Sequence, residues 1–340
     1  MTRRPRLAAA LAASILTATT AAGTAAGTAT AAGTAAAEPP LAVTGYVLAS
    51  TPADVVERDA PALAALGVAS VPISADGRDV RAPGELTRQL RRAHRHGLRA
   101  ELLVSNYSDR LGGFDSRAAR RLLRHEDRVR RVARQLADVV RRQGWDGITV
   151  DLESLSRADG RGLVRLVREL QARMPAERTV SVDLQPSPTV EGYRERGFRV
   201  GAIGRAADVV VVMAYDRHGP TWTGPGPIGP LRWQRSVVEA VLTQVPAAKV
   251  DLGVAGYGYT WPRRGEGRSL TVQRARRLVR EDGARAVWKP AAGEWRSRLS
   301  DGTVLWWSDT RSFRLREELA EELGVHGIAL WRLGSAGPLA

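Results

Sequence analysis

The sequence predicts an α/β fold, a closed (β/α)8 TIM barrel with a small α+β insertion between strands 7 and 8. Three observations lead to this prediction. Eight apolar runs rich in β-branched residues recur along the chain, amphipathic arginine-rich segments separate them, and one interval is far longer than a loop. Continuous apolar strands that alternate with helices indicate a parallel sheet buried on both faces, and eight such units indicate a closed barrel.

The eight strands and their connecting helices follow in chain order. Strands are expected over residues 43–50, 67–73, 98–105, 147–152, 179–184, 208–214, 249–255 and 327–331. Helices are expected over residues 83–96, 118–143, 160–173, 234–244 and, as the last full helix, 312–323.

The interval between the seventh and eighth strands, roughly seventy residues, is too long for an ordinary loop. Short runs near 288–289, 294–296 and 303–306 are typical of antiparallel strands joined by glycine turns. We expect a folded insertion over residues 256–310 that forms one wall of a cleft. Its tryptophans have two interpretations, stacking on sugar rings or packing the insertion onto the barrel.

The N-terminal segment has the pattern of an export signal. Arg3, Arg4 and Arg6 precede an apolar stretch, and an Ala/Gly/Thr tract runs to residue 37. Residues 1–37 are therefore expected to be a removed signal peptide, and residues 38–340 the barrel domain. Pro5 and the lack of a following aromatic residue favour the general export route over the twin-arginine route.

Composition limits location and partners. No later apolar run approaches the ~20 residues of a membrane span, so we expect a secreted protein, extracellular or associated with the cell wall. The absence of cysteine excludes disulfides, thiol chemistry and a lipid anchor on cysteine. The five histidines lack clustered partners, so neither a metal nor a cofactor is expected. We also expect a monomer.

The formal net charge of +15 comes almost entirely from arginine. A basic exported protein is attracted to anionic surfaces such as cell-wall polymers, and salt weakens that attraction. Nucleic acid is the competing partner for such a charge. No recognised nucleic-acid-binding motif accompanies it, so we expect no such partner.

The chemistry is expected at the fourth strand. An Asp146-Gly147 turn introduces the strand, whose alternation places Thr149, Asp151 and Glu153 on one face. Two neighbouring acids raise the pKa of at least one, which keeps a carboxyl group protonated for general-acid catalysis. The alternative is a strand end that places both acids in solvent, and the apolar run ahead of the pair argues against it.

Other strands end in polar or aromatic residues that would meet the acids at the C-terminal rim of the barrel. Strand six ends in Met213-Ala214-Tyr215-Asp216, and strand eight ends in Trp331. The side-chain directions of four further candidates cannot be assigned from the sequence: Tyr46, Asn106, Asp183 and Gln185.

Together these residues resemble glycoside hydrolase family 18. The family signature Asp-Gly-x-Asp-x-Asp-x-Glu matches residues 146–153 with one change, because Thr149 replaces the middle aspartate. The closer likeness is to the branch of spore-cortex and peptidoglycan N-acetylglucosaminidases. It rests on residues 213–218, the Gly-Pro-Gly-Pro loop at 224–227, and residues 256–261, 307–312 and 327–334.

The resemblance implies a role for each matching residue. Glu153 would protonate the glycosidic oxygen and then act as base, Asp151 would hold the 2-acetamido group of the sugar, and Tyr215 would donate to its carbonyl oxygen. The substrate's own acetamido oxygen would be the nucleophile. Further substrate contacts are expected from Asp216, Trp331, Tyr46, Asn106, Gln185 and Met213. The Thr149 hydroxyl can hydrogen-bond Asp151 but adds no negative charge.

The leading hypothesis is a secreted retaining glycoside hydrolase that cleaves β-linked N-acetylglucosamine-containing glycans, peptidoglycan or chitin-like, by substrate-assisted catalysis. The first alternative is a catalytically inactive glycan-binding protein of the same fold, a chitinase-like lectin. The presence of Glu153 argues against it. The second alternative is a barrel glycosidase with a protein nucleophile, for instance Asp216 paired with Glu153.

Overall fold

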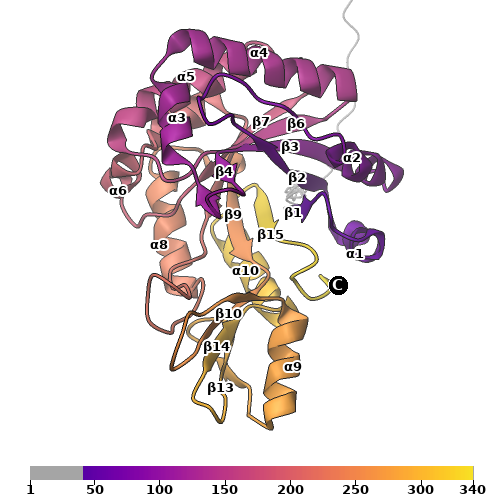
Figure 1. Ribbon diagram of the computed structural model, residues 1–340, viewed down its shortest axis with the longest axis vertical. Coiled ribbons are helices and arrows are strands. Elements are labelled where there is room, and N and C mark those ends of the chain that lie inside the picture. The colour runs from indigo at the N-terminus through magenta and orange to yellow at the C-terminus, as the bar shows by residue number, and fades with distance from the viewer. Residues whose placement is uncertain (1–40, 340) are drawn as a thin grey trace, which may run out of the picture. The chain divides into compact units, whose positions relative to one another are not determined.

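The computed structural model describes residues 41–339, so the expected signal peptide over residues 1–37 lies outside the described residues. Eight parallel strands form a closed barrel in the order β1-β15-β9-β8-β7-β6-β3-β2 (Figure 1). They are β1 (Ala42–Leu48), β2 (Ala65–Pro72), β3 (Arg99–Ser105), β6 (Gly147–Asp151), β7 (Thr179–Leu184), β8 (Val209–Met213), β9 (Val250–Ala255) and β15 (Gly327–Trp331). The eight expected strands are confirmed.

Helices on the outside of the barrel cover the strands, as the continuous apolar runs require. They are α1 (Ala53–Asp59), α2 (Leu86–Arg95), α3 (Ser116–Leu123), α4 (Glu126–Gln143), α5 (Gly160–Gln171), α6 (Val190–Glu195), α7 (Val200–Ala206), α8 (Leu231–Leu242) and α10 (Thr310–Glu322). One large apolar core lies between the helices and the strands. Within residues 41–339, no helix is both long and apolar enough to cross a membrane.

The expected single helix over residues 118–143 is wrong, because the chain forms α3 and α4 there. His125 adopts an extended conformation between them, and α4 begins with Glu126 and Asp127, which favour a helix N-terminus. Gly162 of α5 packs against the end of α3, where an added Cβ would lie 2.1 Å from the Leu123 carbonyl oxygen. Both helices keep the same apolar spacing, so the periodicity gave no sign of the break.

The insertion after β9 is an antiparallel sheet with one helix. Its strand order is β11 (Ser269–Leu270), β10 (Gly258–Trp261), β14 (Val304–Trp307), β13 (Glu294–Arg298) and β12 (Val287–Lys289). Helix α9 (Val272–Asp282), which is not among the helices expected from the sequence, lies beside this sheet (Figure 1). It packs against one face through a cluster that includes Trp307.

The other face of the insertion sheet carries an aromatic cluster of Tyr257, Tyr259, Trp261 and Trp306. The partly buried Tyr215 and Trp331 of the barrel rim pack against this cluster. Trp261, Trp306 and Trp307 are all buried, so these three tryptophans pack the insertion rather than offer a surface for sugar stacking.

Candidate active site

The two acids of the fourth strand lie at the C-terminal end of β6. Asp151 is the last residue of the strand and is buried, and Glu153 follows two residues later, partly buried. The buried Asn106, which follows β3, fixes the backbone of Glu153 from both sides. Its Oδ1 accepts the Glu153 N–H at 2.9 Å and its Nδ2 donates to the Glu153 carbonyl oxygen at 3.0 Å. Both polar atoms of the Asn106 side chain therefore bond the backbone of the acid.

Gln185, which follows β7, holds the carboxyl group of Glu153. Its Nε2 donates to Glu153 Oε2 at 2.7 Å, and its Oε1 accepts the Ser154 N–H at 3.1 Å. Ser154 has a positive φ of 55°, which turns the chain away after the acid. Burial raises the pKa of Glu153 well above its usual value, and the charges of Asp151, Asp216 and Asp183 add to the rise.

The Asp151 side chain is buried at the end of β6. Burial raises the pKa of Asp151 to about 7, although the Ser105 hydroxyl opposes the shift. Its Oδ1 is buried and has no hydrogen-bond partner among the described residues. The Thr149 hydroxyl, which is capable of bonding Asp151, instead donates to Glu101 Oε2 at 3.0 Å.

Glu101 gathers the hydroxyl groups inside the barrel. Its carboxylate accepts from Thr149, Thr179 and Ser181, so it collects the hydroxyl groups that point into the barrel from β6 and β7. Thr149 therefore belongs to an interior polar network below the acids. The Asp151 carboxylate remains available to a group that enters the site.

Tyr46 and Asp183 lie in the barrel interior next to the acids, and both are buried. The Tyr46 hydroxyl donates to Asp183 Oδ1 at 3.2 Å, and its ring lies over Gly67, where an added Cβ would be 2.4 Å from the ring. Burial, followed by the charge of Asp151, raises the pKa of Asp183 well above its usual value. The Trp331 ring packs 5.6 Å from the Tyr46 ring, which places an indole beside this group.

The segment after β8 brings Tyr215 and Asp216 to the same rim. Asp216 has a positive φ of 59°, and its Oδ1 accepts hydrogen bonds from the Tyr257 and Tyr259 hydroxyls, the latter at 2.8 Å. Burial raises the pKa of Asp216, although the two tyrosines oppose the shift. Met213 is the last residue of β8, directly before this segment, and its side chain is buried. The carboxyl of Asp216 therefore faces the insertion.

Tyr257 and Tyr259 were not among the expected site residues. They alternate on the chain around Gly258, so both side chains point to one face of the insertion sheet. Tyr215 packs edge-on against Tyr257 at 6.4 Å. The Tyr-Gly-Tyr alternation was visible in the sequence, but nothing in it indicated that Asp216 would be the partner.

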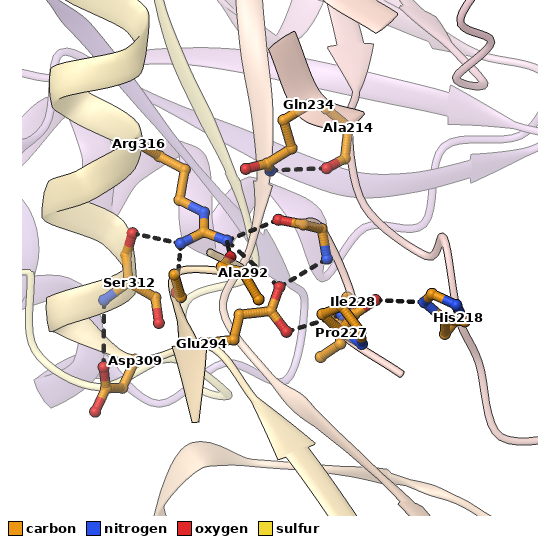
Figure 2. Close-up of polar contacts among 12 residues, drawn as sticks. Ala214, His218, Pro227, Ile228, Gln234, Ala292, Glu294, Asp309, Ser312 and Arg316 are labelled. Carbon is orange, nitrogen blue, oxygen red and sulfur yellow. Dashed lines mark hydrogen bonds and ion pairs between the residues drawn. The ribbon is translucent and has the colours of Figure 1, made fainter. Parts of the chain in front are cut away.

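A buried polar network fastens the loop between β8 and α8 to the insertion (Figure 2). The Glu294 carboxylate, fully buried on β13, accepts the N–H groups of Ile228 and Gly229 at 2.8 and 2.7 Å. Arg316 of α10 lies 3.4 Å from Glu294 and donates to the Gly229 and Ala292 carbonyl oxygens at 2.7 and 3.0 Å. This Glu294–Arg316 network holds the far end of the loop that carries Tyr215 and Asp216.

Exposed aromatic residues extend outward from the rim. Tyr107, in the β4 (Tyr107–Ser108) and β5 (Gly113–Phe114) hairpin, follows the end of β3 and packs edge-on against Phe114. Trp222, in the loop after β8, is 55% exposed and packs edge-on against Tyr259. Both follow C-terminal strand ends, so they extend from the same end of the barrel as the acids.

Residues 41–339 contain no cluster of three or more histidine, aspartate or glutamate side chains arranged to hold a metal ion. The acids at the rim are instead held by Gln185, Tyr46, Tyr257 and Tyr259. This arrangement suits proton transfer and hydrogen bonding to an uncharged polar ligand.

Known proteins resemble this chain in sequence. The family model described as glycosyl hydrolases family 18 matches residues 74–336. The uncharacterized glycosylase YvbX of Bacillus subtilis is 24% identical over 259 residues, covering 73% of this chain and 75% of that protein. The cortical fragment-lytic enzyme of Bacillus subtilis is 28% identical over 251 residues, and the match covers 70% of this chain but only 57% of that enzyme.

Solved structures share the fold. The spore cortex-lytic enzyme SleL of Bacillus cereus superposes with a TM-score of 0.79 at 22% identity, covering 88% of this chain and 72% of that one. A chitinase from Chromobacterium violaceum gives a TM-score of 0.79 at 23% identity, covering 88% of this chain and 96% of that one.

Proposed function

The chain belongs to glycosyl hydrolases family 18 and is a glycoside hydrolase, and from this premise we propose that it cleaves β-linked N-acetylglucosamine-containing glycans with retention of configuration. A wall glycan of the peptidoglycan type is the favoured substrate, because a relative is named for lysis of cortical fragments. We further propose that the enzyme is secreted and acts outside the cell or at the cell wall.

In the proposed first step, Glu153 gives its carboxyl proton to the glycosidic oxygen as the bond from that oxygen to C1 breaks. Burial and the neighbouring carboxylates raise the pKa of Glu153 well above its usual value, which favours the protonated form that this step requires. Gln185 and Asn106 hold the acid in place from the side chain and the backbone. Such preorganisation avoids a reorganisation cost during the reaction.

The acetamido oxygen of the substrate forms the new bond to C1 and produces an oxazolinium ion, as in substrate-assisted glycosidases. Asp151 accepts the acetamido N–H, and its carboxylate stabilises the positive charge that develops. Tyr215 donates its hydroxyl to the acetamido oxygen and so orients it. Water then attacks C1 from the face that the leaving group vacated, gives a proton to the Glu153 carboxylate, and restores the acetamido group.

The buried Asp151 Oδ1 without a hydrogen-bond partner carries this assignment. A buried acceptor left without a donor costs about 1–3 kcal/mol, so its presence beside Glu153 favours a ligand that supplies an N–H group. Trp331 would lie beneath the sugar ring, and Asp216 and Met213 would contact the same sugar.

Glu153→Gln is the direct test. The variant keeps the hydrogen-bonding shape but has no proton to donate, so hydrolysis of N-acetylglucosamine oligomers should fall by at least about 10²-fold while oligomer binding persists. Wild-type turnover in this variant would overturn the role of Glu153. Binding without hydrolysis in the unmodified enzyme would favour the lectin alternative.

A second measurement addresses the nucleophile. Oligomers in which the acetamido group is replaced by a free amine should bind but resist cleavage, because they lack the attacking oxygen. NMR of the first-formed product should show the β anomer. Cleavage of the amine oligomer, or a covalent sugar–protein adduct detected by mass spectrometry, would support a protein nucleophile such as Asp216 instead.

A further inference from the structure

A second charged surface, which shares no residue with the candidate active site, lies on the outer helices of the barrel. Two hollows of about 460 and 470 Å³ adjoin there, since Arg199, Ala202 and Arg205 line both of them. Their walls come from α5, which connects β6 to β7, and from α6, α7 and the segment joining them, which connect β7 to β8. Gln244, which follows α8, completes the lining of the first hollow. Each volume lies within the range of pockets that bind small molecules.

Arginine dominates the lining of the two hollows, which we call the arginine hollows. The six arginines are Arg161, Arg165, Arg168, Arg194, Arg199 and Arg205. Those from α5 recur at four- and three-residue spacing, so they share one helix face that looks into the hollows. Arginine is planar, permanently charged and suited to paired hydrogen bonds with phosphate oxygens.

These arginines are poorly neutralised by the protein. Arg161, Arg168, Arg199 and Arg205 have no carboxylate partner among the salt bridges of residues 41–339. The lining contains one acid, Glu169, which is already bound by Arg173. Two of the six arginines do pair, Arg165 with Glu126 at 2.6 Å and Arg194 with Glu191 at 3.7 Å, so the other four carry the uncompensated charge of the hollows.

We propose that the arginine hollows bind a phosphodiester polymer, specifically a polyol-phosphate chain of the cell wall. A chain of regularly spaced phosphates can engage both hollows at once, and each neutralised arginine releases condensed counterions. The choice of a wall polymer rests on the proposed function, since an enzyme that cleaves wall glycans meets such chains beside its substrate. The site would hold the enzyme on the wall without occupying the catalytic rim.

Nucleic acid fits the hollows less well. Single-stranded nucleic acids bind proteins through aromatic stacking in addition to phosphate contacts. Phe198 is the one aromatic residue in the lining, and it is 1% exposed, so no ring is presented to a base. The hollows therefore present positive charge and no aromatic surface for stacking, and a polyol phosphate requires only the positive charge.

The test uses the chain with four substitutions, Arg161→Gln, Arg168→Gln, Arg199→Gln and Arg205→Gln, and purified poly(glycerol phosphate) as the probe. Calorimetry at several salt concentrations should show binding about tenfold weaker than that of the unmodified chain, with a shallower salt dependence. A matched control changes four exposed arginines in or just before α2 to glutamine, with the same loss of charge: Arg81, Arg88, Arg91 and Arg95. The control should lose less than about twofold.

Equal loss in both variants would overturn the proposal, because binding would then follow net charge alone. Tighter binding of single-stranded DNA or RNA than of poly(glycerol phosphate), lost in the hollow variant only, would overturn the choice of partner. Hydrolysis of a soluble oligosaccharide should be unchanged in the hollow variant. Conversely, Glu153→Gln should still bind the polymer, so failure of the catalytic proposal is distinguishable from failure of this one.

Discussion

At the scale of single residues, the site depends on several carboxyl groups that share one buried space. The pKa of Glu153 is raised first by burial and then by Asp151, Asp216 and Asp183. Asp183 is the informative member, because it lies behind the acids, bonded to Tyr46, and has no assigned contact with substrate. Its charge can therefore be removed while the proposed proton donor and the acetamido partners remain in place.

Asp183→Asn should move the alkaline limb of the pH profile of kcat/KM to lower pH. Loss of the Asp183 charge lowers the pKa of Glu153, so the acid loses its catalytic proton at a lower pH, by about half a unit or more. Tyr46→Phe is the matched control, because it removes the same hydrogen bond and leaves the Asp183 carboxyl in place. An alkaline limb that does not move in Asp183→Asn would mean that Asp183 is uncharged when Glu153 titrates.

At the scale of elements, the loop after β8 depends on the insertion for its position. Asp216 is bonded by Tyr257 and Tyr259 near the start of the loop, and Glu294 and Arg316 hold its end. The insertion is therefore part of the proposed catalytic machinery as well as a wall beside it. Its folding and the geometry of Tyr215 should be coupled.

Glu294→Gln tests this coupling. The substitution leaves the buried Arg316 without its charge partner, which typically destabilises a protein by about 3–5 kcal/mol. Below the melting temperature, kcat should still fall about tenfold, because a small displacement of Tyr215 impairs alignment. Hydrogen exchange of residues 217–229 should also increase.

Glu322→Gln provides the control for this change. It breaks a surface ion pair with Arg235 by the same chemical substitution, at an exposed position. Stability should change by at most about 1 kcal/mol, and kcat should stay at the wild-type value. Unchanged kcat and exchange in Glu294→Gln would show that the network stabilises the insertion without positioning the loop.

The sequence predicted the barrel well because each strand is a continuous apolar run, a signal that depends on neighbouring residues alone. It failed where the outcome depends on distant contacts. The end of α3 packs closely against Gly162 of α5 just before the break at His125, and the partner of Thr149 is Glu101 on another strand. The Glu294 network joins residues more than sixty positions apart, and no local pattern predicts such a pairing.

At the scale of the whole molecule, a cluster of buried acids makes stability depend on pH. The pKa values of Asp151, Glu153, Asp183 and Asp216 are all raised by burial. A folded protein with raised acid pKa values holds protons that the unfolded chain has released. The stability that these bound protons give the folded protein is complete below the pKa values of the unfolded chain, near 4. It is lost as pH rises through the pKa values of the folded protein.

Asp151→Asn should therefore stabilise the protein at high pH while abolishing its proposed role in catalysis. The folded pKa of Asp151 is about 7, against about 3.9 in an unfolded chain, and this difference of about three units corresponds to roughly 4 kcal/mol. The melting temperature of the variant should match that of the wild type near pH 4. It should exceed the wild-type value by several degrees at pH 8, where the wild type carries the buried charge.

Asp79→Asn supplies a control of opposite sign. Hydrogen bonds from Gln135 and then from Arg131 lower the pKa of Asp79, so its contribution to stability is present above the unfolded pKa and is lost as pH falls. That variant should melt slightly below the wild type at pH 8, and the difference should shrink toward pH 3. If Asp151→Asn also melted below the wild type at pH 8, the buried Asp151 carboxylate would be a net stabilising group, and the site would have been selected without a cost in stability.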